Sequence, residues 1–383
     1  MTFIFEYLLE GSHDEAGLEV SQLFAGYFLT PVVAAVSDLG IPRVLAGRAL
    51  TSAEVAAELG TDPDATARLL RAGIATGLLA RDAAGRYTLT SLGDRLRPDV
   101  SGLGDTGGFW MPPMMVALAG LADQVRTGRT VDPGAPGGFW DYLSEHPAEV
   151  AKFSRAMGYV TSRLLVALTE AGYQPPRVSR VVDVGGSRGT LLSWLLKALP
   201  SATGVVFDRP ESLSPEYLAA AGVADRASLV PGSFLDSVPE GDLHALSQVL
   251  HNWDDDSVRR IAANCARSAP PGGWLVVIDY VLPAGPEPAV GQVMDMLMMV
   301  LLGGRERTVS EHRELIEPAG YTFTREVPLM SGVTNQAPPW RVLEFQRDAL
   351  PVRGPDRLVG CGQPRGDPVA PPGRRGRRRA RRA

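Results

Sequence analysis

The sequence predicts an α/β fold: a Rossmann-like, doubly wound parallel sheet, preceded by a smaller, mainly helical N-terminal domain. Three observations support this prediction. Beyond residue 178, short β-branched runs alternate with amphipathic helical segments, the pattern of a parallel sheet covered on both faces. A glycine-rich stretch at 185–189 follows the first of these runs and precedes a helical segment. Before residue 100, two capped helical segments precede two short strands, which is the order of a winged helix.

The N-terminal segments support the winged-helix interpretation in order. Residues 18–48 place apolar side chains at helical spacing. Thr51 and Glu54 form a capping-box pattern at the start of the next helix, and residues 61–79 give a second capped helix. Residues 79–93 are typical of two short strands around a turn.

The winged-helix pattern raises DNA binding as a hypothesis, with the second helix as the element that enters the groove. Residues 51–94, however, hold six acids and four arginines, whereas a phosphate backbone requires a basic face. We therefore predict no specific nucleic-acid partner and interpret this region as a packing or dimerisation domain. A ligand-sensing winged-helix regulator that binds nucleic acid through an arginine-rich C-terminal tail stays open as an alternative.

Composition indicates a globular protein with a sizeable core. Of the 383 residues 45% are hydrophobic and 21% are charged, and the net charge is −5. Cys265 and Cys361 form no metal or redox spacing, which favours a reducing, cytoplasmic location. The first residues lack a basic flank, so we expect no signal peptide there. The longest apolar run, 293–304, is interrupted by Asp295 and is too short for a membrane span.

The middle and the end of the chain differ from the sheet region. Residues 102–175 are predicted to be connecting helices whose Trp, Phe and Met side chains form core or the wall of an apolar ligand site. The last residues combine Pro and Gly with seven arginines between Arg374 and Arg382, typical of a disordered tail. The predicted divisions are an extension at 1–17, the winged-helix domain at 18–101, connecting helices at 102–175, the sheet domain at 176–348 and the tail at 349–383.

In the sheet region, the spacing of the apolar residues and the length of each run distinguish strands from helices. Buried-strand runs are predicted at 180–185, 202–208, 243–250 and 272–282, followed by an antiparallel pair at 321–329 and 340–348. Helices are predicted at 190–199, 254–269 and 312–320. In doubly wound folds, ligands bind at the carboxyl ends of the parallel strands.

The glycine-rich loop after the first strand is a predicted ligand site. A dinucleotide pattern would need glycine where Ser187 and Thr190 stand, and a phosphate-binding P-loop would need a lysine. The pattern that fits is acid-x-Gly-Gly-x-x-Gly, in which glycines allow a bulky ligand to lie against bare backbone. Its members are Asp183, Gly185, Gly186 and Gly189.

Two acids would hold a nucleoside ligand at this edge. Asp183, at the end of the first strand, can accept a hydrogen bond from a cationic amine. Asp208 ends the next strand, 25 residues later, and is placed to accept ribose hydroxyls. The alternative for Asp208 is a cap on the turn before Pro210.

His251 is the candidate base. The chain has five histidines, and His251 stands at the carboxyl end of the run at 243–250, on the ligand-binding edge of the sheet. The three acids at 254–256 are interpreted as a helix cap and first-turn charges, because a divalent metal needs several convergent oxygen ligands. We therefore predict no metal. The alternative is that His251 is a structural histidine.

Six motifs occur in the order and spacing of a known family: "VVDVGGSRGT", "VVFDRP", "VPGSFLD", "VLHNWDDD", "GGWLVVIDYVLP" and "LLGGRERT". Over residues 18–346 the chain resembles the S-adenosylmethionine-dependent O-methyltransferases of the caffeate, hydroxyindole and bacterial polyketide type. The resemblance implies a seven-stranded methyltransferase sheet and a homodimer formed through the N-terminal domain. It also implies methyl transfer from S-adenosyl-L-methionine, leaving S-adenosyl-L-homocysteine, to a hydroxyl of an aromatic small molecule in antibiotic or other natural-product biosynthesis.

The resemblance assigns His251 as general base, with Asp279 and Glu306 beside its imidazole. A phenol with a pKa of about 10 is a poor nucleophile at neutral pH, whereas an imidazole with a pKa of about 6.5 is partly free to take its proton. From the residues alone, Asp279 could simply end a strand, and Glu306 could pair with a neighbouring arginine on a solvated turn.

The resemblance also implies two binding sets. The cofactor set is Asp183, Gly185, Gly186, Gly189, Asp208, Gly232, Ser233, Phe234 and Ser247. The substrate set is Phe153, Met157, Asn252, Met294 and Met298. The chain departs from the usual pattern at four positions, where a glycine, an acid, a basic residue and an aspartate are replaced by Ser187, Ser233, Ser247 and Asn252 respectively. Relatives that use this fold and cofactor for hydroxylation or decarboxylation leave a non-methylating reaction as the alternative.

Overall fold

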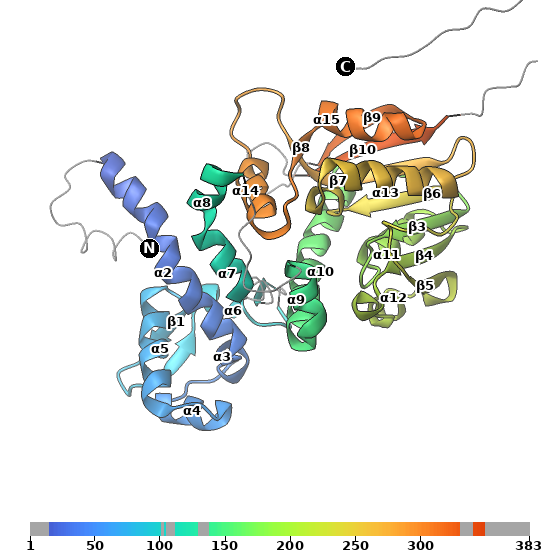
Figure 1. Cartoon of the computed structure of the whole chain (residues 1–383). Coiled ribbons are helices and arrows are strands. Elements are labelled where there is room, and N and C mark those ends of the chain that lie inside the picture. The colour runs from blue at the N-terminus through green and yellow to red at the C-terminus, as the bar shows by residue number, and fades with distance from the viewer. Residues whose placement is uncertain (1–14, 101–102, 105–111, 129–137, 330–339, 349–383) are drawn as a thin grey trace, which may run out of the picture. The chain divides into compact units, whose positions relative to one another are not determined.

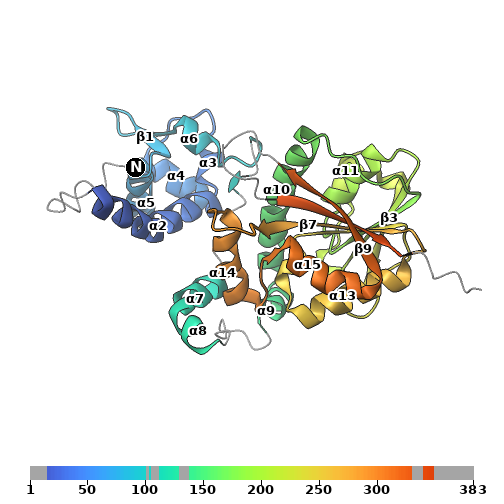
Figure 2. The same cartoon turned by 90° about the horizontal axis from the view of Figure 1, so that it is seen from above.

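A twisted sheet of seven strands, with a short eighth strand beside it, organises the C-terminal half of the chain (Figures 1 and 2). The computed structural model describes residues 15–100, 103–104, 112–128, 138–329 and 340–348. The predicted tail at 349–383 and most of the predicted extension at 1–17 lie outside these residues.

The strand order is β5-β4-β3-β6-β7-β10-β9, and β8 pairs with β7. The bounds are β3 Arg180–Val184, β4 Thr203–Asp208, β5 Ala227–Pro231, β6 Leu243–Ser247, β7 Trp274–Leu282, β8 Arg307–Thr308, β9 Tyr321–Leu329 and β10 Trp340–Arg347. The strands from β5 to β7 run parallel, whereas β10 is antiparallel to both β7 and β9. The predicted α/β fold, with its seven-stranded doubly wound sheet, is confirmed.

Alternate side chains of each inner strand pack on opposite faces. In β3, Val181 belongs to one hydrophobic core, and Val182 and Val184 belong to the other. Both faces therefore bury branched apolar side chains, which is why these strands are almost continuously apolar. The first core includes α10 Pro147–Glu170, α11 Thr190–Ala198 and α12 Glu216–Ala220, and the second includes α13 Asp255–Ser268 and α15 Val309–Ile316.

The strand order reverses between β3 and β6. After β3 the chain builds β4 and β5 on one side, and it then returns to place β6 and β7 on the other. The crossovers leave a crevice at the carboxyl ends of the two central strands, which is where doubly wound folds bind ligands. The glycine loop follows β3 and the His251 segment follows β6, so both lie at this switch point.

The N-terminal region has the predicted helix, helix and β-wing. Thr51 and Glu54 form both hydrogen bonds of the capping box, and Asp62 caps the second helix. The long helical region breaks at Gly40, whose φ of 77° ends one helix and starts another. The bounds are α2 Glu15–Asp38, α3 Ile41–Val44, α4 Ser52–Leu59, α5 Pro63–Ala75, β1 Leu79–Arg81, β2 Tyr87–Leu89 and α6 Ser91–Asp94.

The connecting region is helical where it is described. Met114, Phe139 and Leu143 form an apolar cluster with Val300 and Leu301, so the connecting helices pack on a helix that follows β7. The bounds are α7 Pro112–Ala119, α8 Leu121–Thr127, α9 Phe139–Glu145 and α14 Val290–Leu302. The short 3₁₀ helices are η2 Pro210–Ser212, η3 Ala224–Arg226, η4 Leu250–Asn252 and η5 Glu317–Ala319. Within the described part of the chain, every helix is too short or too polar to cross a bilayer.

Two strands differ clearly from the sequence prediction, and one alternative for Asp279 is excluded. The strand expected at 243–250 ends at Ser247, because Gln248 has a left-handed φ of 55° that breaks the extended backbone. The strand β7 ends at Leu282, as predicted, so Asp279 lies inside the strand and the alternative that it simply ends one is wrong. The strand β5 was not expected as a separate run, because its edge position leaves its side chains only partly buried and its apolar pattern weak.

Candidate active site

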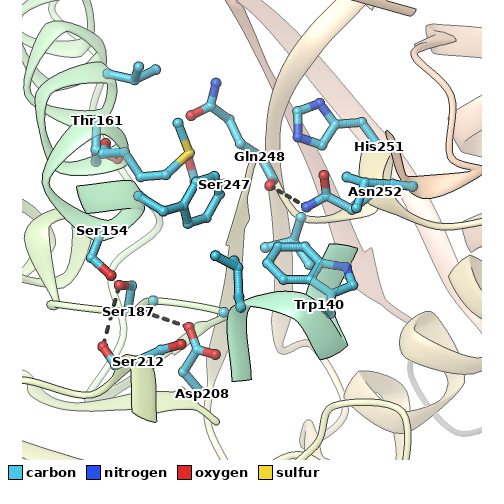
Figure 3. A pocket seen from close by; sticks show the side chains of 18 of the residues that line it. Trp140, Ser154, Thr161, Ser187, Asp208, Ser212, Ser247, Gln248, His251 and Asn252 are labelled. Carbon is cyan, nitrogen blue, oxygen red and sulfur yellow. Dashed lines mark hydrogen bonds between the residues drawn. The ribbon is translucent and has the colours of Figure 1, made fainter. Parts of the chain in front are cut away.

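A cavity of about 550 Å³ opens at the switch point (Figure 3). Its walls come from the glycine loop, from the ends of β4 and β6, and from the helices α9, α10 and α14. In Figure 3, Ser187, Asp208 and Ser212 gather at one end, whereas Gln248 and His251 lie at the other. Both ends therefore carry polar groups, whereas α10 and α14 contribute mainly apolar wall residues.

The glycine loop turns sharply after β3. Gly185 has a φ of 73°, and a Cβ on it would lie 2.7 Å from a methyl carbon of Val249. A Cβ on Gly186 would lie 2.5 Å from the carboxyl carbon of Asp183. Both positions therefore require glycine. Ser187, where the family pattern has a third glycine, has a φ of 47°, and its backbone N–H donates to Asp208 Oδ2 at 2.9 Å.

Asp183 is a buried carboxyl at the base of this loop. It is 2% exposed, and its Oδ2 accepts a hydrogen bond from the Leu192 N–H at 3.0 Å. Burial raises the pKa of Asp183 to about 7, the Leu192 hydrogen bond opposes this rise, and the charge of Asp208 adds to it. The carboxyl therefore joins β3 to α11 and also lines the cavity.

Asp208 combines the two roles considered for it. Its Oδ1 accepts from the Arg209 N–H at 2.7 Å, which caps the turn before Pro210. Its Oδ2 accepts from Ser187, and the residue lines the cavity. Burial raises the pKa of Asp208, and these two backbone donors oppose the rise. Each oxygen keeps a lone pair free to accept a ligand hydroxyl.

The predicted cofactor residues divide into two groups. The cavity wall includes Asp183, Gly185, Gly186, Asp208, Phe234 and Ser247. Gly189, Gly232 and Ser233 are not among the residues that line it. Close packing accounts for two of these glycines, since a Cβ on Gly189 would meet Leu218 at 2.8 Å and one on Gly232 would meet the Phe207 ring at 2.5 Å.

His251 lies in η4, on the cavity wall, and is 6% exposed. Its Nδ1 lies 2.8 Å from Glu306 Oε1. An ionised carboxylate only accepts hydrogen bonds, so Nδ1 carries the hydrogen and neutral His251 keeps its lone pair on Nε2. The ring is thus fixed in the tautomer that a base at Nε2 needs.

The surroundings of His251 favour its protonated form. Burial lowers the pKa of the imidazole, but the hydrogen bond that Nδ1 donates to Glu306 and the charges of Asp279 and Glu306 outweigh burial, so the net pKa is raised. These acids therefore stabilise the imidazolium that forms when His251 takes a proton.

Glu306 is held inside the protein and not on a solvated turn. It is 3% exposed, and its backbone N–H donates to Asp295 Oδ1 at 2.9 Å. Burial raises the pKa of Glu306, and its contact with His251 opposes the rise. The neighbouring Arg307 binds Asp255 at 2.7 Å instead, which excludes the pairing of Glu306 with Arg307.

The segment that carries Glu306 is packed directly on the His251 segment. Arg307 donates to the carbonyls of Leu250 at 3.2 Å and Trp253 at 2.9 Å, on either side of His251. The Arg305 N–H donates to the His251 carbonyl at 2.9 Å. A Cβ on Gly304 would lie 2.1 Å from that same carbonyl oxygen, so glycine is required for this approach.

The predicted substrate residues Phe153, Met157, Asn252, Met294 and Met298 all line the cavity. Phe153 packs edge-on against Phe139 and Trp140. Trp140 belongs to the Trp, Phe and Met side chains expected to form core or an apolar wall, whereas Ser154, Gln248 and Tyr280 are wall residues that the sequence did not reveal. Gln248 stands three positions before His251, but its left-handed backbone, which sets its direction, has no sequence signal outside glycine and asparagine.

The acids after His251 serve the helix that follows. Asp254 caps α13 by accepting from the Ser257 N–H at 2.8 Å, as the sequence predicted. In the residues that the structure describes, His, Cys, Asp and Glu side chains form no group of three or more that could hold a metal ion. His251 and Glu306 equip this site for acid–base chemistry on a ligand in the cavity.

Comparison with known proteins relates this site to a family. The family model of the O-methyltransferase dimerisation domain matches residues 21–99, and that of the O-methyltransferase domain matches residues 119–322. A phenazine O-methyltransferase of Lysobacter antibioticus is 33% identical, over 82% of this chain and 93% of that protein. The O-demethylpuromycin-O-methyltransferase of Streptomyces alboniger is 35% identical, over 78% and 82% respectively.

A solved structure agrees with these relatives. It is an O-methyltransferase from neocarzinostatin biosynthesis, in complex with S-adenosylmethionine and 2-hydroxy-5-methyl naphthoic acid. It superposes with a TM-score of 0.68 at 31% identity, covering 84% of this chain and 96% of that one.

Proposed function

The chain belongs to the O-methyltransferase family, and on that premise we propose that it transfers a methyl group from S-adenosyl-L-methionine to a hydroxyl of an aromatic natural product. In this proposal His251 is the general base, and S-adenosyl-L-homocysteine is the second product. The observation that carries the proposal is the buried His251–Glu306 hydrogen bond of 2.8 Å, which frees Nε2 on the wall of the cavity that the glycine loop also lines.

The residues at the glycine-loop end of the cavity fit the proposed cofactor. Gly185 and Gly186 expose backbone where the ligand would lie, and the Ser247 hydroxyl is buried without a protein hydrogen-bond partner. Asp183 would accept from the cofactor's ammonium group and Asp208 from its ribose hydroxyls. Bound there, S-adenosylmethionine would supply an electrophilic methyl group on a positively charged sulfur.

His251 performs the proton transfer in this mechanism. Its Nε2 takes the phenolic proton as the oxygen attacks, because the free phenol is a weak nucleophile at neutral pH. Glu306 holds the ring by Nδ1, and the negative charges of Glu306 and Asp279 stabilise the imidazolium. Base catalysis of this kind typically contributes about 10²–10⁴-fold, and alignment of the reacting atoms supplies much of the remainder.

The cavity walls support an aromatic acceptor. Phe153, Met157, Met294 and Met298 form an apolar, polarisable surface that suits a flat ring. Phenazine, naphthoate and puromycin-type compounds appear in the names of the relatives and of the solved structure, which supports the same substrate class. The alternative is non-methylating chemistry on the same fold and cofactor, which product mass distinguishes because methylation alone adds one CH₂.

We further propose that the active species is a homodimer formed through the N-terminal domain. The match to a dimerisation domain supports this, as does the apolar face of α2, where Leu23, Phe24, Tyr27 and Phe28 are between 67% and 81% exposed. A cytoplasmic location, without membrane or specific nucleic-acid partners, remains a prediction.

The test uses wild-type protein and His251→Ala, with labelled S-adenosylmethionine and a panel of hydroxylated aromatic acids and polyketides. We expect the variant to bind the cofactor normally and to lose label transfer by about a hundredfold or more. His146→Ala is the matched control, because His146 is exposed and does not line the cavity. Equal transfer by His251→Ala and wild type on one acceptor would show that His251 is structural.

A further inference from the structure

An arginine of the glycine loop, Arg188, lies on the cavity wall and was not among the predicted binding residues. Its side chain is 28% exposed, so it is largely enclosed by the protein. The guanidinium reaches α10, where a Cβ on Gly158 would lie 3.9 Å from Arg188 Nη1. Arg188 therefore extends from the glycine loop to one of the helices that line the cavity.

The Arg188 guanidinium has only a weak charged partner in Glu216. Glu216 Oε2 lies 3.8 Å from Arg188 Nη2, which is too far for a hydrogen bond, and the Glu216 side chain is 80% exposed. Exposed ion pairs of this kind contribute little to stability, and a guanidinium carries several N–H donors. The donors of Arg188 are thus available to a ligand in the cavity.

The proposed cofactor carries two opposite charges on one carbon atom. Its methionine part ends in an ammonium group and a carboxylate, so both groups reach the protein close together. Asp183 can accept from the ammonium group, but a carboxylate beside Asp183 needs donors of positive charge. Without such donors the carboxylate would lose its hydration in the cavity and gain nothing in return.

The described residues that line the cavity include two arginines, Arg188 and Arg209, and no lysine. Arg209 directly follows the acid proposed to hold the ribose. Its Nε lies 3.2 Å from Glu211 Oε1, and its guanidinium carbon lies 5.4 Å from the centroid of the Trp140 ring, so it is already engaged. Arg188 instead belongs to the same turn between β3 and α11 that begins beside Asp183. Arg188 is thus the arginine placed at the methionine end.

We propose that Arg188 binds the carboxylate of the cofactor's methionine part, while Asp183 binds the ammonium group beside it. The two side chains together recognise both charges of the amino-acid group. A planar guanidinium can donate two parallel hydrogen bonds to one carboxylate, which adds direction to the charge attraction. The inference rests on the proposed cofactor but not on methyl transfer, because it concerns binding alone.

The experiment measures by calorimetry how the protein binds S-adenosylmethionine and decarboxylated S-adenosylmethionine, which keeps the sulfonium, the ammonium group and the nucleoside. Arg188→Met removes the charge and leaves an unbranched side chain, whereas Arg188→Lys keeps the charge without the planar fork. Arg177→Met is the matched control, because Arg177 is exposed and is not among the residues that line the cavity. Thermal unfolding establishes that each variant is folded.

Wild type should bind S-adenosylmethionine about 10–100-fold more tightly than the decarboxylated ligand. In Arg188→Met the affinity for S-adenosylmethionine should fall by a similar factor, whereas the affinity for the decarboxylated ligand should not fall, so the preference disappears. Arg188→Lys should lose part of the preference, and it carries the test if the Met variant does not fold. Arg177→Met should bind both ligands as wild type does.

An unchanged preference for the carboxylated ligand in the Arg188 variants would overturn the proposal. An equal loss of affinity for both ligands would also overturn it, because Arg188 would then only support the shape of the glycine loop. If wild type binds neither ligand, the proposed cofactor is wrong and the assignment of Arg188 falls with it. A preference that Arg188→Met abolishes, in a protein that methylates no acceptor, would contradict the proposed methyl transfer and leave the Arg188 site in place.

Discussion

Burial raises the pKa of single carboxyl groups in this protein. The pKa of Asp183 rises to about 7 in the folded chain, because burial penalises its charged form. A group whose pKa is raised by folding stabilises the protein fully below its unfolded value of about 3.9, and this stability is lost as the pH rises through the folded pKa. The ligand-free protein therefore carries an unfavourable charge at pH 8, which a cationic ligand group would neutralise.

Asp183→Asn should separate stability from affinity. The amide oxygen can still accept from the Leu192 N–H, so we expect the ligand-free melting temperature at pH 8 to be unchanged or higher. Loss of the charged hydrogen bond should weaken S-adenosylmethionine binding by about 10–100-fold. Calorimetry of binding and thermal unfolding across pH 5–8 would test this. Unchanged affinity would remove Asp183 from the cofactor site.

The neighbours of His251 also determine how the proposed activity should depend on pH. Its pKa is raised, so the neutral base is restored only as the pH rises above the ordinary histidine value. In the proposed reaction, kcat/KM should therefore climb with pH through a limb that lies above about 6.5.

At the scale of elements, the site depends on the close approach of two segments that are distant in sequence. Residues 303–308, which end in β8, lie against η4, so one short contact holds both His251 and the acid that orients it. Arg307, 1% exposed, closes this contact by binding the carbonyls of Leu250 and Trp253. Small shifts here should translate into misplacement of the base.

Gly304→Ala tests this contact. Its Cβ would lie 2.1 Å from the His251 carbonyl oxygen, so one segment must move, and we expect a loss of about a hundredfold in kcat/KM with cofactor binding retained. Gly222→Ala is the control, because Gly222 has a φ of 71° but open space around it, so strain costs about 1 kcal/mol without a clash. Equal activity of the two variants would mean that the contact adjusts freely.

The elements also explain what could be predicted from the sequence. The strands β3, β4, β6 and β7 are buried on both faces, and their unbroken apolar runs are readable. The edge strand β5 and the two-residue β8 have no such pattern and were missed. The glycine loop and His251 each directly follow a readable strand, so their position at the ligand-binding edge could be predicted from the sequence.

Contacts between distant segments could not be predicted from the residues alone. Glu306 reaches His251 from 55 positions away, and the resemblance, not the pattern, placed them together. Gln248 lines the cavity because its backbone is left-handed, and the sequence around it gives no signal for that conformation.

At the scale of the whole molecule, the N-terminal domain leaves an apolar helix face uncovered. On α2, Phe24 is 72% exposed and Phe28 is 71% exposed, whereas Val36, further along the helix, is fully buried in the winged-helix core. Exposed apolar side chains gathered on one helix indicate a protein interface. In the wing, Arg86 is paired with Asp82 at 2.8 Å, which reduces the positive charge available to nucleic acid there.

Phe24→Asp/Phe28→Asp should convert the proposed dimer into a monomer, because two charges would have to be buried in an apolar interface. Light scattering after size-exclusion chromatography measures the mass, and Glu19→Lys on the same helix is the control for a surface charge change. If the double variant is still a dimer, the interface does not lie on this face of α2.

The walls of the cavity come from two parts of the fold, and these parts should differ in how readily their residues can be substituted. The side that carries the glycine loop and His251 is built by strand ends that also carry the core, so mutations there endanger folding. The opposite side comes from the helices α9, α10 and α14, whose wall residues include Met157, Met294 and Trp140. Descendants of this chain could therefore acquire new methyl acceptors by changes confined to residues 139–161 and 290–302. The residues proposed to carry the methyl transfer itself would stay the same.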